Sequence, residues 1–279
     1  MQLDLFSQEN MQLSKAFEMV RSLQFAEALQ CYKAILRQNP DQPQALEGSH
    51  LAAKWNSVWR QCGHFNREDD VHLVYQELLE SEATWGISPS FKMAVLQKLT
   101  AEMERLNMHF LEEGLSLGDL WMEIEEPDRA EVEYERYLKE QPHHAYWHMQ
   151  LANSQYIQHK QRPPAVHYTL ALLYGLSAND YPRIQHPGLR NYLTEHKPKH
   201  PAAMVWIMGF LPLLRPNELN PHPASDKEKP SEEIALYQLL ITAENQRKGN
   251  SRQMLAARKK LKEANAEVFE AYLKKLERR

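Results

Sequence analysis

Residues 117–142 read LGDLWMEIEEPDRAEVEYERYLKEQP and carry the clearest helical pattern of the chain. Its second half repeats a small or aromatic side chain at steps of four and three, at Ala130, Tyr134 and Tyr137. That is the spacing of one face of an α-helix, and a helix does not continue through Pro142. The stretch therefore predicts two helices, over about 115–126 and 128–140, joined by a short turn.

The chain on both sides of this stretch shows the same helical spacing. Apolar residues recur at steps of three and four in two runs before Asn39-Pro40, namely Leu13, Ala16, Phe17 and Val20, then Phe25, Ala28, Leu29, Tyr32, Ile35 and Leu36. Further helices are expected over 43–60, 71–82, 90–111, 145–159, 164–175 and 188–196. The apolar run between Pro201 and Arg215 predicts a buried helix. Ser231 is placed to cap the next helix.

One last helix is expected from about Ser251 onward. It places an apolar stripe at alternating steps of three and four, at Met254, Ala257, Leu261, Ala264, Val268 and Ala271. The composition agrees with a helical chain throughout, because Val, Ile and Thr together make up only 22 of 279 residues and glycine only 9. We expect an all-α fold of ten or more helices and no sheet.

Composition also excludes several classes of protein. Two cysteines, Cys31 and Cys62, cannot form a disulfide framework or a four-cysteine zinc site, and they fit a reducing compartment. The first residues lack the basic and apolar regions of a secretory signal, and no apolar run is long enough to span a membrane. We expect a cytoplasmic protein. Residues 246–279 carry eleven Lys/Arg against four Asp/Glu. This charge can mark a polyanion-binding tail, but a solvated terminal helix is commoner, so direct nucleic-acid binding is not expected.

Residues 111–144 resemble a tetratricopeptide repeat, a helix–turn–helix unit of thirty-four residues. The matching residues are Leu117-Gly118 and Trp121 in the first helix, and Ala130, Tyr134, Tyr137 and Pro142 in the second. Residues 9–42 resemble the unit through Ala16, Phe25, Ala28, Tyr32, Ile35 and Pro40, and residues 145–178 through Leu151-Ala152 and Ala165. The alternative is an ordinary helical domain that matches the repeat by chance.

The resemblance implies repeats stacked into a right-handed superhelix, with an inner groove lined by the first helix of each unit. The groove positions that it implies are Glu112, Leu115, Asp119, Met122, Glu123, Tyr146, Met149, Asn153 and Tyr156. Aromatic and Met side chains there would suit an apolar segment of a partner. The same side chains could instead be buried core. The Lys/Asn arrangement of chaperone-binding members is absent, so chaperone binding is not expected.

Four parts of the chain are expected from these patterns. They are a flexible N-terminal segment over 1–8, a helical-repeat domain over 9–214, a Pro-rich linker over 215–230 and a C-terminal helical hairpin over 231–279.

The N-terminal pentapeptide resembles the motif by which many bacterial DNA polymerases and repair proteins bind the replication sliding clamp. All five positions match, at Gln2, Leu3, Asp4, Leu5 and Phe6. In such a ligand Leu and Phe enter an apolar pocket while Gln hydrogen-bonds at its rim. The alternative is that Asp4 caps the first helix and the three apolar side chains pack onto the fold.

Thirteen histidines raise the question of a metal site. His144 and His148 are four apart on an expected helix and could share a metal, but the sequence supplies no third ligand, so we expect no metal site and no cofactor. Phosphate-binding loops, nucleophile elbows and kinase motifs are also missing from the sequence. We therefore expect a non-enzymatic adaptor that binds a protein segment. The alternative is a clamp-bound accessory protein in bacterial DNA replication or repair.

Overall fold

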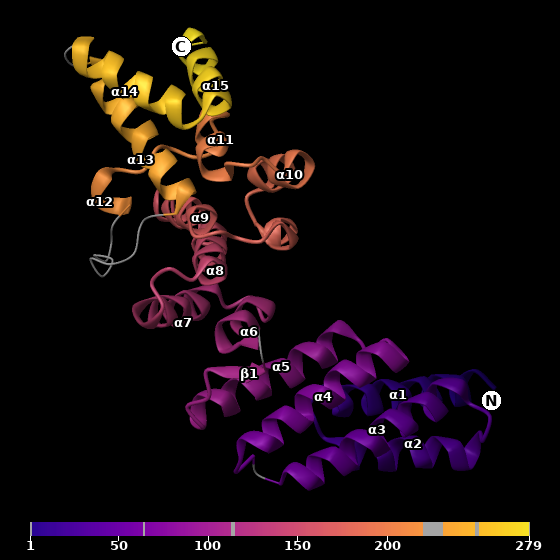
Figure 1. The fold of residues 1–279 in the computed structure, drawn as a ribbon. Coiled ribbons are helices and arrows are strands. Elements are labelled where there is room, and N and C mark those ends of the chain that lie inside the picture. Colours follow the sequence, from indigo (N-terminus) through magenta and orange to yellow (C-terminus); the bar gives the residue numbers. More distant parts are fainter. Residues whose placement is uncertain (1, 64, 113–114, 220–230, 249–250, 279) are drawn as a thin grey trace. The chain divides into compact units, whose positions relative to one another are not determined.

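The structure, a computed structural model, describes residues 2–63, 65–112, 115–219, 231–248 and 251–278 (Figure 1). It divides into two compact units, Met1–Glu125 (unit 1) and Glu126–Arg279 (unit 2). Helices make up most of the described residues, which confirms the all-α expectation. None of the described helices combines the length and the hydropathy that a membrane crossing requires.

Unit 1 consists of six helices and two short strands in its described part. In chain order these are α1 (Gln2–Arg21), α2 (Phe25–Gln38), α3 (Pro43–Cys62), α4 (Glu68–Trp85), α5 (Pro89–Arg105), β1 (Phe110–Glu112), β2 (Leu115–Ser116) and α6 (Leu117–Glu123). Helices that follow each other in the chain pack against each other from α1 to α6, and α5 also returns to contact α1.

Aromatic rings from three helices form the centre of unit 1. Phe91 of α5 meets Phe25 of α2 and Trp55 of α3 edge to face, at ring-centroid distances of 6.0 and 5.2 Å. The Trp55 indole donates to the Ser81 hydroxyl of α4 at 3.0 Å, so its N–H is satisfied although the residue is fully buried. These contacts explain why the single turn between α4 and α5 folds α5 back onto the first helices.

Small residues let the helices of unit 1 approach closely. Ala28 of α2 is fully buried, and so is Tyr32 one turn further on. The Tyr32 ring lies over Gly48 of α3, where an added Cβ atom would stand 2.4 Å from its Cζ atom. No described residue hydrogen-bonds the Tyr32 hydroxyl, and burial raises its pKa to about 12.

Cys62 ends α3 in the interior of unit 1. Its thiol donates to the backbone oxygen of Asp70 at 3.6 Å. Burial, followed by the nearby charge of Asp70, raises the pKa of the Cys62 thiol to about 11. The thiol is therefore protonated at neutral pH and closed to solvent.

Residues 106–116 depart from the helical expectation. The helix predicted over 90–111 ends at Arg105, because Asn107 takes the left-handed conformation (φ 55°) and Met108 donates back to the oxygen of Met103 at 2.8 Å. The chain then forms the antiparallel pair β1–β2, so the expectation of no sheet was wrong. The next helix, expected over 115–126, begins later, since Ser116 caps α6 together with Asp119.

Unit 2 contains the remaining helices. They are α7 (Pro127–Glu140), α8 (Ala145–Ile157), α9 (Pro163–Leu173), the 3-10 turn η1 (Ala178–Arg183), α10 (Pro187–His196), α11 (Pro201–Ile207), α12 (Pro216–Leu219), α13 (Glu232–Asn245), the 3-10 turn η2 (Gln246–Lys248), α14 (Ser251–Ala264) and α15 (Ala266–Glu277). Five of the α-helices open with proline at their first position, where the missing N–H costs nothing.

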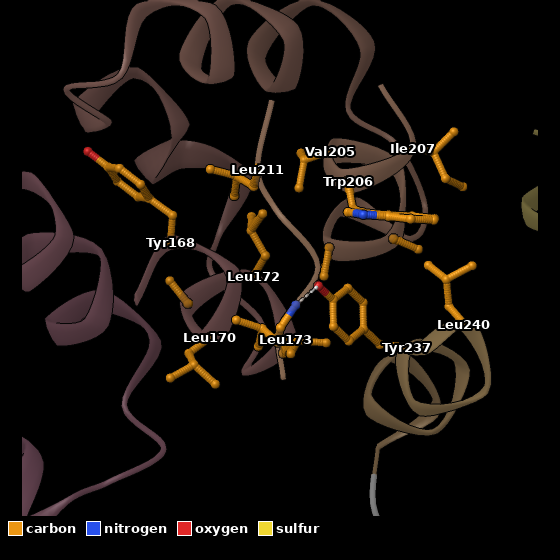
Figure 2. Close-up of a cluster of buried hydrophobic side chains, with 14 of the residues drawn as sticks. Tyr168, Leu170, Leu172, Leu173, Val205, Trp206, Ile207, Leu211, Tyr237 and Leu240 are labelled. Atoms are coloured by element: carbon orange, nitrogen blue, oxygen red, sulfur yellow. Dashed lines mark hydrogen bonds between the residues drawn. The ribbon is translucent and has the colours of Figure 1, made fainter. Parts of the chain in front are cut away.

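The core of unit 2 lies between α9, α11 and α13. Figure 2 shows Leu172 and Leu173 of α9 facing Trp206 of α11 and Tyr237 of α13. The Tyr237 hydroxyl accepts from the backbone N–H of Leu214 at 3.3 Å, which satisfies a polar group in an apolar interior. The buried helix expected between Pro201 and Arg215 is shorter than predicted. It ends after Ile207, because Gly209 turns left-handed (φ 89°) and Phe210 donates to the oxygen of Val205.

The C-terminal part of unit 2 holds three helices rather than two. The last helix, expected to run unbroken from about Ser251, is divided at Asn265 into α14 and α15. The Asn265 side chain accepts from Val268 N at 2.9 Å and so caps α15. Its amide nitrogen lies 2.9 Å from Nε2 of the buried His200 at the start of α11.

Helix α12 occupies the first residues of the predicted linker. Its Glu218 carboxylate accepts two hydrogen bonds from the Arg162 guanidinium, at 2.9 and 2.6 Å, and Leu219 is buried. The rest of that linker, 220–230, lies outside the described residues, as do Gly249 and Asn250. Ser231 caps α13 as predicted, by accepting from Ile234 N.

Candidate partner-binding site

Three consecutive helices of unit 2, together with Glu218 of α12, border an open hollow of about 410 Å³, here called the α7–α9 pocket. Helix α8 packs against both α7 and α9. The pocket is lined by Glu135, Leu138, Lys139, Pro142, His148, Leu151, Val166, His167, Leu170 and Glu218. Its walls are mainly aliphatic, and two histidines are its only described uncharged polar side chains.

The turn between α7 and α8 fixes one end of the pocket. His144 caps α8, since its Nδ1 atom accepts from Trp147 N at 3.4 Å, and its ring stacks on the Trp147 indole. Trp147 in turn packs against Tyr137 of α7, with 5.1 Å between the ring centroids. These rings hold α7 and α8 in register and place Pro142 at the rim.

His148 and His167 form a pair that joins α8 to α9. Their Nδ1 atoms lie 3.0 Å apart, and Nε2 of His148 lies 2.9 Å from the backbone oxygen of Pro142. Burial lowers the pKa of His148 to about 3 and that of His167 to about 4, because each imidazolium would lose its hydration. Both rings are therefore neutral at physiological pH.

A half-buried carboxylate ties the other end of α7 to α8. Glu131 accepts from the side chains of Gln155, Gln158 and Lys160 at 3.1, 2.9 and 2.5 Å. Burial alone would raise the pKa of Glu131, but these hydrogen bonds outweigh it and lower the pKa overall. Glu131 is thus satisfied by its own chain and is not available to a ligand.

The predicted groove residues of α8 lie on the face of that helix away from the α7–α9 pocket. Met149 and Asn153 are buried. The Asn153 amide donates to the backbone oxygen of Arg183 and accepts from Tyr168 and Gln185, so the chain's own η1 segment covers it. Tyr146 and Tyr156 are half-buried, and Tyr156 lines a second hollow of about 400 Å³ beside Lys160 and Arg162.

The other predicted groove residues belong to unit 1. Asp119 is used in the cap of α6, Glu123 pairs with Lys92 at 2.9 Å, and Leu115 and Met122 are half-buried. The side chain of Glu112 lies outside the described residues. Because these residues and those of α8 lie in different units, a common groove for all nine remains a prediction.

The clamp-like motif Gln2–Phe6 forms the beginning of α1 as far as the backbone is concerned. The side chains of Gln2–Phe6 lie outside the part of the chain that the structure describes. His144 and His148, which were considered as a metal pair in the sequence, make separate contacts: His144 caps α8, and His148 pairs with His167. In the described part of the chain, no three His, Cys, Asp or Glu side chains converge as metal ligands would.

Sequence reasoning missed most of the pocket. His167 and the aliphatic wall were not singled out, although Leu138, Leu151 and Leu170 are regularly spaced apolar residues of three adjacent helices. A clue was available in His148 and His167, which fall on helix faces that are otherwise apolar. The position of a hollow between three helices depends on how the helices pack. The spacing of residues in the sequence does not contain that information.

In comparisons with known proteins, the chain matches no family model and no curated protein is significantly similar to it.

Proposed function

We propose that the protein is a non-enzymatic adaptor that binds a segment of a protein partner in the α7–α9 pocket. The observation that carries the proposal is the pocket itself, which presents aliphatic walls and two neutral histidines between three stacked helices. A hollow of about 410 Å³ can receive a large side chain of a partner, and such inserted side chains dominate binding energy at protein interfaces.

The same proposal includes a tetratricopeptide-like architecture. It is supported by Ala28 and Ala130, which are fully buried on α2 and α7, and by Tyr32 and Tyr134, which are buried one turn later on the same helices. These are the positions at which the repeat needs small and aromatic residues. The best-matching repeat, residues 111–144, crosses the boundary between the units, because it contains α6 of unit 1 and α7 of unit 2. Stacking of the repeats into a right-handed superhelix is therefore also part of the proposal.

Filling the pocket tests the proposed site. Val166 lines it and is half-buried, so Val166→Trp should place a large ring in the space that a partner would use. Val132→Trp is the matched control, because Val132 lies on neighbouring α7, is 64% exposed and does not line the pocket. The unmodified protein and Val132→Trp should capture the same proteins from a cell extract. Val166→Trp should fail to capture them. Equal capture by all three would retire the pocket as the binding site.

A second function is favoured by the match of five consecutive residues to the sliding-clamp motif. Clamp ligands bind in an extended conformation, whereas α1 begins at Gln2. Docking would therefore require the first turns of α1 to unwind, and the body of the protein would act as the tethered effector.

Titration with a purified bacterial sliding clamp tests this second function. Leu5→Ala with Phe6→Ala should abolish binding, because each side chain contributes roughly 1.5–3 kcal/mol when fully buried. Met11→Ala is the matched control, since Met11 lies on the same helix, is 69% exposed and falls outside the motif. Absence of binding by the unmodified protein would end the clamp hypothesis.

A further inference from the structure

The hydrogen-bond pattern of the histidine pair fixes the position of every proton in it. Nε2 of His148 faces the backbone oxygen of Pro142, which can only accept, so this nitrogen carries the proton. A neutral His148 then has a lone pair on Nδ1. Because Nδ1 of His167 lies 3.0 Å from that lone pair, it must donate. His167 therefore keeps its remaining lone pair on Nε2.

This lone pair is open to a ligand. No described residue donates a hydrogen bond to Nε2 of His167. This nitrogen is also not one of the buried side-chain atoms that lack a hydrogen-bond partner in the described chain, so it is accessible from outside. His167 itself lines the α7–α9 pocket. The pocket thus offers an imidazole acceptor beside the aliphatic side chains of Leu138, Leu151 and Leu170.

The charged groups at the rim do not compete for this role. Glu218 is held by Arg162 and by the backbone N–H of Arg215, and Glu135 and Lys139 are exposed on α7. Away from these carboxylates, a ligand that lies against Leu138, Leu151 and Leu170 meets apolar surface and one imidazole acceptor, Nε2 of His167. Such a ligand should be largely apolar and should carry one hydrogen-bond donor. It should carry no acceptor, because an acceptor would have no partner beside these aliphatic side chains.

We propose that the α7–α9 pocket binds a tryptophan side chain of the partner, whose indole N–H donates to Nε2 of His167. Among the side chains, indole alone joins a large apolar surface to a group that only donates. A phenol would bring oxygen lone pairs into an apolar space, and a phenyl ring would leave His167 unpaired. This inference rests on the proposed function and names the side chain that the pocket recognises.

Two measurements on the unmodified protein test the inference. Long-range ¹H–¹⁵N spectra of the histidine rings should show His148 protonated at Nε2 and His167 protonated at Nδ1. Titration with N-acetyl-tryptophanamide should shift both rings, and the 1-methylindole derivative should bind about two- to tenfold more weakly because it has lost one hydrogen bond. The reversed tautomers, or equal affinity for the two probes, would overturn the inference.

His167→Phe gives a further comparison, since it keeps a ring in the wall but removes the acceptor. It should bind both probes with the same affinity, whereas His50→Gln, an exposed histidine of α3, should discriminate as the unmodified protein does. The capture experiment with Val166→Trp is independent of these results. Loss of partners in that variant, without any advantage of the indole N–H, would reject the tryptophan inference and leave the proposed function standing.

Discussion

Gly48 sets how closely α2 and α3 approach each other. The Tyr32 ring occupies the place of its missing side chain, so the aromatic residue and the glycine form one packed pair. Sequence spacing predicted that Tyr32 would be buried, and the structure confirms it. Its partner could not be predicted, because glycine carries no hydrophobic signal and is unfavourable in a helix unless packing requires it.

Gly48→Ala is expected to destabilise the protein. Alanine has the higher helix propensity by about 1 kcal/mol, but its Cβ would lie 2.4 Å from Tyr32 Cζ, and overpacking of this kind costs about 1–3 kcal/mol. Denaturant unfolding should show the loss. Gly188→Ala in α10 is the matched control, since its Cβ would stay 3.3 Å from the Phe210 ring and should cost less. A variant of Gly48 as stable as the unmodified protein would contradict the close contact.

At the scale of elements, the sequence predicted most of the helices correctly but placed several helix ends wrongly. The apolar stripe from residue 254 to 271 continues in phase across Asn265, so periodicity predicted one helix where the structure has α14 and α15. Asn107 likewise ends α5 six residues before the predicted limit. Asn107 ends its helix by adopting the left-handed conformation, as glycine commonly does. Asn265 caps the start of α15, as serine commonly does.

Asn265→Ala should loosen the joint between α14 and α15. It removes the cap of α15, worth about 1–2 kcal/mol, and also the contact with His200. Asn265→Asp is informative beside it, because aspartate keeps the capping oxygen but loses the amide that faces His200. Thermal melting should therefore rank the unmodified protein above Asn265→Asp, and Asn265→Ala lowest. Equal melting of the alanine variant and the unmodified protein would show that the joint does not depend on the cap.

Ala130 tests the pairing of α7 with its neighbours. It is fully buried, so Ala130→Leu should overpack the helix contact and cost roughly 1–3 kcal/mol. Val132→Leu on the same helix, at an exposed position, should change stability little. If the two substitutions have the same effect on unfolding, the repeat-like alignment of this helix is wrong.

At the scale of the whole molecule, the all-α class followed from composition, but the division into units did not. The boundary between Glu125 and Glu126 falls inside the stretch that matches the repeat best. Local spacing describes pairs of neighbouring helices and contains no information on which pairs share a core. For the same reason the α7–α9 pocket, which needs three helices at once, lay beyond the sequence prediction.

Acid should destabilise the protein through the buried histidine pair. Burial lowers the pKa of His148 to about 3 and of His167 to about 4, whereas an unfolded histidine titrates near 6.5. Between these values the unfolded chain takes up protons that the folded protein does not, so stability falls as pH decreases. The slope is up to ~1.4 kcal/mol per pH unit for each histidine.

Denaturant unfolding at several pH values from 7 to 5 checks this slope, above the ordinary titration range of carboxylates. Burial raises the pKa of Glu233, so the slope of the unmodified protein is compared with that of variants of the pair. The double variant His148→Gln with His167→Gln should show a shallower dependence, whereas His50→Gln, which replaces an exposed histidine, should match the unmodified protein. An unchanged slope in the double variant would mean that the pair is not buried in neutral form.

The closed environment of Cys62 gives unit 1 a built-in chemical reporter. Iodoacetamide alkylates thiolates, and a buried thiol with a pKa of about 11 can react only in molecules whose unit 1 has opened. Half-buried Cys31 supplies an internal reference, and unit 2 contains no cysteine at all. The rate at which mass spectrometry detects the Cys62 adduct therefore measures the opening of unit 1 alone. Compared with unfolding of the whole chain, that rate would reveal whether the two units melt together or one after the other.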